Sequence, residues 1–292
     1  MITPELLPKG VLIAIGGNED KGTFPKSKKQ FQLNFFELGI LKRVIDTMGG
    51  TQAKIEVITT ASMIPEEVGN MYLQAFGVLG CQNVGIMHIR EEAEVNQPLY
   101  LDRLRAANGV MFSGGDQSRL ARIFSGTAFH QILLDRYQKE EGFVIAGTSA
   151  GAMAMSDIMI KGGSSSRSLL KGAVKLDRGL AFQKNVIFDS HFVKRGRFGR
   201  LMEAVATHPF KIGIGLGEDT GVLISQGNYI ETIGSNLVIV VDGHHIKHNN
   251  TDYVTPGTPL SIENMLVHVL AIGNYYDIRE RKFCHKQNPT QE

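Results

Sequence analysis

The residues best suited to chemistry lie around Ser149, in the stretch Gly147-Thr-Ser149-Ala-Gly151. An apolar run at 143–146 precedes it and small residues follow, so we expect a strand, a tight turn and a helix. The Gly-x-Ser-x-Gly spacing is that of a nucleophile elbow, because small neighbours let strand and helix pass closely while the serine is pushed toward solvent. The N–H of Ala150 would then point at a developing oxyanion. The motif alone predicts a nucleophile no better than it predicts a plain Gly/Ser turn.

A serine is a poor nucleophile unless a base takes its proton and a third group orients that base. Among nine histidines, His191 follows the apolar run 186–188. We expect this run to be a strand whose carboxyl end lies on the same sheet edge as Ser149. Glu218 and Asp219 end the next apolar run on that edge, and either of them could orient the imidazole.

Other histidines offer weaker alternatives. An α/β-hydrolase would need a late histidine, and His268 or His285 is available. The antiparallel pattern after residue 220 argues against that arrangement. The remaining cluster lies in a polar stretch and indicates a solvated loop rather than a metal site: His244, His245 and His248.

Two further motifs could complete the site. Gly114-Gly-Asp-Gln117 ends the strand before the nucleophile strand, and its glycines let an amide approach a substrate oxygen closely. The N–H groups of Gly115 and Ala150 would then form an oxyanion hole. Three arginines follow His191 within residues 194–200, and planar guanidinium groups bind carboxylates bidentately. These arginines suggest an anionic substrate group, against the plainer interpretation of a basic helix start.

The elements that must position these residues alternate between strands and helices. Continuous apolar runs, typical of strands buried on both faces, occur at residues 10–17, 54–60, 83–89, 109–113 and 143–148. Helical spacing of apolar residues occurs between them, at residues 31–48, 65–79, 101–107 and 129–139. The chain is therefore predicted to be α/β, with a doubly wound, mostly parallel sheet and functional loops at the carboxyl ends of its strands.

The last part of the chain departs from this alternation. Short strands separated by tight turns are predicted at 222–224, 229–233 and 237–241, which indicates a C-terminal antiparallel extension. Residues 263–270 are predicted to form a closing helix. Since no linker or repeat divides the sequence, we expect a single domain over 1–292, with its core at 10–241 and the extension at 242–292.

The composition excludes several classes of protein. The 292 residues are 42% hydrophobic with a formal net charge of +2, so the chain should be globular, with no global field for nucleic acid or a membrane surface. Two distant cysteines, Cys81 and Cys284, fit free thiols in a reducing compartment. No leader-like segment and no run of about 20 apolar residues is found, and we expect a cytoplasmic protein.

Five ordered motifs together resemble one family. They are Gly114–Gln117, Gly147–Ala152, Asp189-Ser-His-Phe192 with the following arginines, Thr207-His-Pro209 and Gly215–Thr220. The family is that of the cyanophycinases, S51-type serine peptidases related to peptidase E, with a fold similar to class I glutamine amidotransferases. The sequence departs from the family pattern at Ser190, where Gln is expected, and at Gly217, where Asp is expected.

The resemblance implies hydrolysis of cyanophycin, a poly-aspartate with arginine on each β-carboxyl, to β-Asp-Arg dipeptides by a homodimer without metal or cofactor. It implies Ser149 as nucleophile, His191 as base and Glu218 as third member. Residues implied to line the substrate pocket are Gln117, Asp189, Ser190, Arg195, Arg197 and Arg200. Each polymer unit offers a carboxylate to arginines and a guanidinium to an acid such as Asp189. The alternatives are a peptidase E-like aspartyl dipeptidase, which has less need of the arginines, and a non-catalytic binding protein of the same fold.

Overall fold

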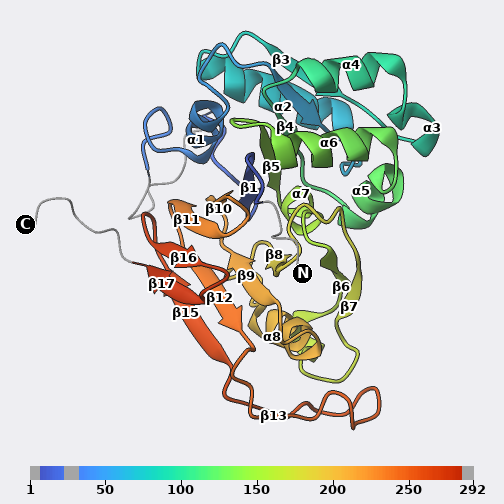
Figure 1. Cartoon of the computed structure of the whole chain (residues 1–292), viewed down its shortest axis with the longest axis vertical. Helices are drawn as coiled ribbons and strands as arrows, with labels where there is room; N and C mark the ends of the chain where they lie inside the picture. The colour runs from blue at the N-terminus through green and yellow to red at the C-terminus, as the bar shows by residue number, and fades with distance from the viewer. Residues whose placement is uncertain (1–6, 23–32, 285–292) are drawn as a thin grey trace, which may run out of the picture.

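The computed structural model describes residues 7–22 and 33–284, and within them a nine-stranded sheet forms the centre (Figure 1). Its order is β17-β16-β11-β10-β1-β5-β4-β2-β3. The adjacent parallel strands are β1 (Val11–Ile15), β5 (Val144–Thr148), β4 (Gly109–Phe112), β2 (Ile55–Ile58) and β3 (Val84–Met87). These strands confirm the predicted parallel sheet.

Helices cover both faces of the parallel strands. Alternate residues of β1 enter different core clusters, because successive side chains of a strand point to opposite faces. Ile13 and Ile15 pack with α1 (Ile40–Thr47) and α2 (Pro65–Val78), whereas Leu12 and Ala14 pack with helices of the other face. The other helices of this part are α3 (Glu92–Val95), α4 (Pro98–Ala106), α5 (Gln117–Phe124), α6 (Ala128–Lys139) and α7 (Ala150–Met153).

Two helix predictions need correction. The helix predicted over 31–48 begins only at Ile40, because residues 33–39 form turns in which the Asn34 carbonyl accepts three backbone N–H groups. Residues 31 and 32 lie outside the described part of the chain. Helix α5 was not predicted from the sequence, and it begins after Asp116, whose carboxylate caps it by accepting from the Ser118 N–H at 2.8 Å.

A second, four-stranded sheet carries the run 186–188, which was wrongly expected in the same sheet as the Ser149 strand. Both sides of β5 are already paired, with β1 and β4, so this run has no place beside it. The sheet has the order β15 (Leu266–Leu270), β12 (Val238–Asp242), β9 (Ile212–Leu216), β8 (Val186–Asp189). Strands β8 and β9 are parallel, and α8 (Phe198–Thr207) packs on them.

The antiparallel strands from residue 220 onward contribute to both sheets. A predicted hairpin, β10 (Thr220–Ser225) and β11 (Tyr229–Gly234), pairs with β1, but β12 crosses to the second sheet instead of pairing with β11. The helix predicted over 263–270 is wrong, because alternating exposure at Val267 and Val269 marks the edge strand β15. The remaining strands are β6 (Ile158–Gly162), β7 (Lys175–Arg178), β13 (His248–Asn249), β14 (Ile262–Glu263), β16 (Tyr275–Asp277) and β17 (Lys282–Cys284).

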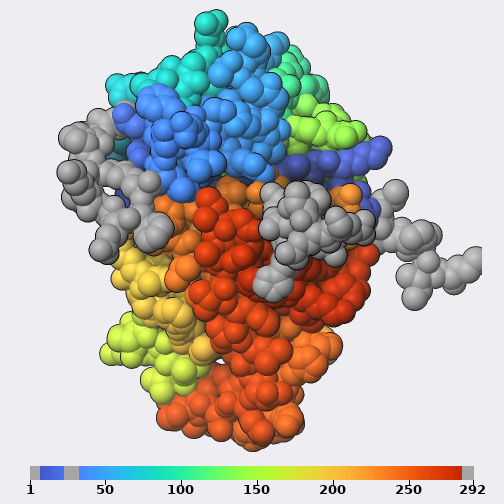
Figure 2. Space-filling model, turned by 90° about the vertical axis from the view of Figure 1, so that its left-hand side faces the viewer, coloured from blue at the N-terminus to red at the C-terminus, as the bar shows by residue number. Residues whose placement is uncertain are grey.

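Figure 2 shows the C-terminal strands, in red, directly below the blue segment that contains α1 and α2. Strand β16 pairs with β11 and β17 pairs with β16, so the end of the described chain extends the first sheet. No helix of residues 7–22 or 33–284 has the length and apolar content to cross a membrane.

Candidate active site

Ser149 occupies a strained turn between β5 and α7, as the motif predicted. Its backbone angles are φ 51° and ψ −110°, and its N–H donates to the Ile15 carbonyl at 2.8 Å. The flanking glycines are required by close packing: a Cβ on Gly147 would lie 2.7 Å from the Gly151 carbonyl carbon, and one on Gly151 would lie 2.5 Å from the Phe112 oxygen. The backbone therefore holds the serine rigidly at the end of a central strand.

His191 reaches Ser149 from the second sheet. Its Nε2 lies 3.0 Å from Ser149 Oγ, and its Nδ1 lies 2.8 Å from Glu218 Oε1. His191 follows β8, Glu218 follows β9 and Ser149 follows β5, so the carboxyl ends of strands from both sheets meet here. The His191 N–H also donates to the Gly16 carbonyl at 2.8 Å, which ties the two loops together. The three residues form a continuous hydrogen-bond chain.

The acid that orients the imidazole in this structure is Glu218. Burial alone would raise the pKa of Glu218, but hydrogen bonds from His191, Lys194 and Asn18 outweigh it and lower the pKa. The carboxylate is therefore charged at neutral pH. The Asp219 carboxylate is used elsewhere, since it accepts from Ser235 Oγ at 2.5 Å and from a backbone N–H at 2.9 Å.

The surroundings of His191 favour the neutral imidazole at pH 7. Burial lowers the pKa of His191 below its ordinary value of 6.5, the Glu218 hydrogen bond opposes this, and the charges of Arg195 and Arg197 add to the lowering. A neutral imidazole with Nδ1 bonded to a carboxylate has Nε2 available to accept the serine proton. The arrangement is that of a general base next to a hydroxyl.

The loop Gly114–Gln117 lies against the serine. A Cβ on Gly114 would be 3.4 Å from the Ser149 Cβ, an ordinary contact distance, so Gly114 lies directly beside the serine. A Cβ on Gly115 would be 2.0 Å from the Ala61 oxygen, so position 115 requires glycine. Within the described residues, the amides of Gly115 and Ala150 donate to no protein acceptor. Both are therefore available to hydrogen-bond an oxygen of a ligand.

The residues expected to line a substrate pocket divide into two groups. Asp189 is completely buried, and its carboxylate accepts from Arg197 at 3.0 Å and from Arg200 at 2.8 Å. Ser190 is also buried, with its Oγ 3.2 Å from Met153 Sδ. The burial and pairing of Asp189 differ from the expected direct contact with a substrate guanidinium. Asp189, Ser190 and Arg200 therefore form a buried group that supports Arg197.

The second group is accessible. Arg197 is half-buried and also donates to the Ser190 carbonyl at 2.7 Å, whereas Arg195 is exposed and pairs with none of the described side chains. Gln117 is half-buried and donates from its amide to the carbonyls of Ile160 (2.8 Å) and Lys161 (3.1 Å). Arg195 and Arg197 therefore present positive charge beside His191.

Glu19 is a site residue that the sequence reasoning missed. Its side chain is 1% exposed and accepts from Lys21 Nζ (2.7 Å), Tyr72 Oη (2.5 Å) and Thr148 Oγ1 (2.7 Å). Burial would raise its pKa, but Lys21 and these hydrogen bonds hold the pKa at about 2. Glu19 thus joins the loop after β1 to the residue before Ser149. The sequence did contain a signal for Glu19, because it is an acidic residue two positions after Gly17, where the first predicted strand ends.

His268, one of the two late histidines, does not take part in this arrangement. His268 lies in β15 with its ring centroid 5.6 Å from that of Tyr276, and its Nε2 is buried without a described partner. His285 lies outside the described residues. The place of His268 does not support the α/β-hydrolase order.

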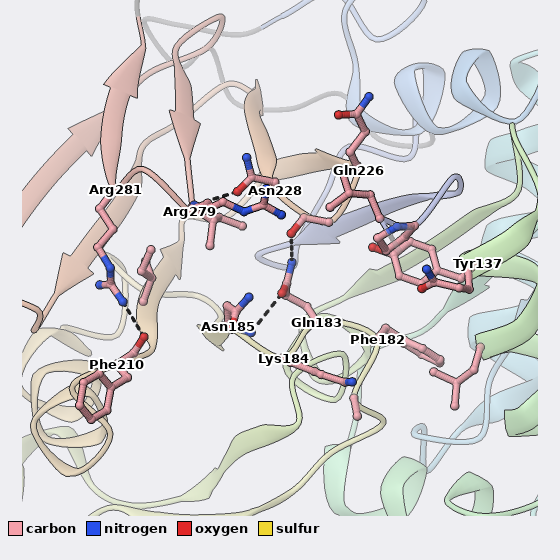
Figure 3. A pocket seen from close by; sticks show the side chains of 18 of the residues that line it. Tyr137, Phe182, Gln183, Lys184, Asn185, Phe210, Gln226, Asn228, Arg279 and Arg281 are labelled. Carbon is pink, nitrogen blue, oxygen red and sulfur yellow. Dashed lines mark hydrogen bonds between the residues drawn. The ribbon is translucent and has the colours of Figure 1, made fainter. Parts of the chain in front are cut away.

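A hollow of about 670 Å³ lies at the other ends of the strands, before β8 and β9 (Figure 3). Its polar groups largely bond one another: Gln183 donates to the Gly227 carbonyl at 3.0 Å, and Arg281 donates to the Phe210 carbonyl at 2.6 Å. Because Ser149 follows the carboxyl end of its strand, this hollow is separate from the hydrogen-bond chain described above.

The fold and the Ser149–His191–Glu218 chain define a class, hydrolases of the serine type on an α/β sheet. Within that class the chain belongs to peptidase family S51, whose sequence profile matches residues 29–232.

Similar proteins agree with this assignment. The cyanophycinase of Trichormus variabilis is 34% identical over 281 residues, which cover 96% of this chain and 89% of that protein. The cyanophycinase of Synechococcus elongatus is 34% identical over 279 residues, which cover 95% and 82%. The crystal structure of a peptidase from an acI-B1 Actinobacterium shares the fold, with a TM-score of 0.63 and 20% identity over 94% of this chain and 98% of that one.

Proposed function

We propose that this chain is a serine-type cyanophycinase, which hydrolyses multi-L-arginyl-poly-L-aspartate to β-Asp-Arg dipeptides. Membership of family S51 and 34% identity to proteins named cyanophycinase support the substrate. The observation that carries the mechanism is the 3.0 Å contact between Ser149 Oγ and His191 Nε2, with Glu218 2.8 Å from Nδ1.

In the proposed reaction, His191 Nε2 takes the proton of Ser149 as Oγ attacks the aspartyl α-carbonyl carbon. The N–H groups of Gly115 and Ala150 stabilise the resulting oxyanion. As the peptide C–N bond breaks, His191 returns the proton to the leaving amine. Water, deprotonated by the same imidazole, then releases the acyl group and restores the serine. Glu218 holds the imidazole in the required tautomer throughout.

The arginines are proposed to recognise the free carboxylate of the substrate arginine. Arg195 is exposed, whereas 13% of the Arg197 side chain is exposed, and bidentate pairing suits their planar groups. We assign Asp189 and Arg200 a positioning role, because Asp189 hydrogen-bonds both Arg197 and Arg200. Gln117 is proposed to line the same pocket, and the Ser190 backbone carbonyl supports Arg197.

Three broader proposals concern the whole chain. It folds as one domain, because no linker or repeat divides the sequence. It acts as a homodimer, as the resemblance to the family implies, and it acts in the cytoplasm. The two thiols of the sequence, neither in a disulfide, are compatible with a reducing compartment. Light scattering on the purified protein measures the oligomeric state, and a monomer mass would contradict the dimer.

The function is tested by incubating the purified protein with insoluble cyanophycin, following clearing and identifying the products by mass, alongside Ser149→Ala. We expect release of β-Asp-Arg by the wild type and a loss of at least about a thousandfold in the variant. Cleavage of Asp-X dipeptides without clearing would assign the protein to the aspartyl dipeptidases. Substantial turnover by the variant would contradict the role of Ser149.

A further inference from the structure

A charged groove lies beside the proposed site, between α5 and the β6–β7 hairpin. Its volume is about 500 Å³, and Asp116, which lines it, is the residue between Gly115 and Gln117. The Gln117 amide donates to the carbonyls of Ile160 and Lys161 and so fastens the hairpin to this loop. The groove therefore lies next to the loop that carries the Gly115 amide.

Positively charged residues outnumber carboxylates in the groove. Its charged lining residues are Arg119, Arg122, Lys161, Arg178, Asp116 and Asp177. Four cations less two carboxylates leave a formal charge of +2. Lys161 Nζ lies 2.9 Å from Asp177, and Arg119 donates to a backbone carbonyl at 2.9 Å. Arg122 and Arg178 are exposed, and neither guanidinium pairs with a residue that the structure describes.

We propose that this groove binds the polymer unit next to the cleaved pair, an inference that rests on the proposed function. Each cyanophycin unit carries a free carboxylate and a guanidinium. The carboxylate complements the planar groups of Arg122 and Arg178, which can bind it bidentately, and the guanidinium complements Asp116. A two-unit chain has no further unit to place there, so the groove favours long substrates over short ones.

The experiment compares steady-state kinetics on soluble cyanophycin chains and on a two-unit chain, for the wild type and the Arg122→Ala/Arg178→Ala double variant. We expect the variant to raise KM for the long chains about five- to tenfold relative to KM for the two-unit chain. High salt should reduce this difference, because both arginines are exposed and screened. Arg105→Ala, an exposed arginine of α4 paired only with Asp102, is the matched control.

Equal effects of the double variant on long and two-unit chains, or no effect on either, would overturn the inference while leaving the proposed function intact. A wild type that releases no β-Asp-Arg from the polymer would overturn both. A thermal unfolding midpoint matched to the wild type shows that a kinetic change is not caused by misfolding.

Discussion

At the scale of single residues, the proposed chemistry depends on the protonation of His191. As the base it must be neutral, so activity falls when the pH drops through its pKa. Burial lowers the pKa of His191, and the positive charges of Arg195 and Arg197 lower it further. Glu218 limits the decrease by hydrogen bonding to Nδ1. The acid limb of kcat/KM should therefore lie below pH 6.5, the ordinary value for histidine.

Arg195→Ala tests this account. Removal of the positive charge raises the pKa of His191, so the acid limb of kcat/KM moves to higher pH. The pH at the midpoint of the acid limb does not depend on a uniform loss of substrate binding. Such a loss lowers kcat/KM by the same factor at every pH. Arg105→Ala removes an exposed charge from α4 and should leave the midpoint in place. An unchanged or lowered midpoint in Arg195→Ala would contradict the electrostatic role.

The sequence was most informative at this scale. Ser149, His191 and Glu218 could be picked out because strand ends and small-residue turns have local signatures. The choice between Glu218 and Asp219 could not be made, since both follow the same strand and only the positive φ of Asp219, 50°, turns its carboxylate toward Ser235. The burial of Asp189 was also hidden, because it depends on arginines that fold back onto it.

At the scale of elements, the loop after β1 holds the geometry of the proposed catalytic residues. Gly17 has φ 99°, and a Cβ there would lie 2.5 Å from Cε1 and Nε2 of His191. Gly17→Ala should displace the imidazole and lower kcat about a hundredfold, since catalysis is sensitive to shifts of about 1 Å. Gly49→Ala is the matched control, because Gly49 has φ 105° but no atom near its Cβ position. If both variants lose activity equally, backbone strain rather than the ring contact is responsible.

Glu19 fastens the same loop to the Ser149 strand. Its pKa is lowered from 4.5 to about 2, so its carboxylate contributes about 3 kcal/mol above pH 4.5, and this contribution is lost as the pH falls toward 2. Glu19→Gln should lower the unfolding free energy by about that amount at pH 7, with a smaller deficit at pH 3. Urea unfolding at both values measures it. Glu67→Gln, an exposed carboxylate of α2, is the control. A deficit independent of pH would exclude the charge as its cause.

Prediction of elements succeeded where hydrophobic spacing is local. The parallel strands and α2, α4 and α6 followed from that spacing. The short helix α5 was missed because its apolar residues, Leu120, Ile123 and Phe124, span little more than one helical turn. The hairpin β6–β7 was missed because its strands have only five and four residues. Residues 263–270 were assigned to a helix because a short apolar run has the same pattern in either element, and only pairing with β12 makes it the strand β15.

At the scale of the whole molecule, the site exists because two sheets are held together. The division of the strands between two sheets could not be predicted from the sequence. Strands far apart in the sequence pair according to which strand edges are still unpaired in the folded chain. One contact between the sheets is the ion pair of Asp242, the last residue of β12, with Arg281, which lies between β16 and β17. Asp242 is 1% exposed, and Arg281 also donates to the Phe210 carbonyl.

Arg281→Ala should therefore destabilise the fold by about 3 kcal/mol, because it leaves a buried carboxylate without its partner. Lys282→Ala removes the neighbouring cation, whose pair with Glu280 spans 3.5 Å between exposed side chains, and should cost at most about 1 kcal/mol. Adding Asp242→Asn to Arg281→Ala should recover part of the loss, since no charge then remains buried. Urea unfolding followed together with activity should show both lost at the same lower midpoint, as the second sheet carries His191 and Glu218. Equal stability of Arg281→Ala and Lys282→Ala would show that this ion pair does not hold the sheets together.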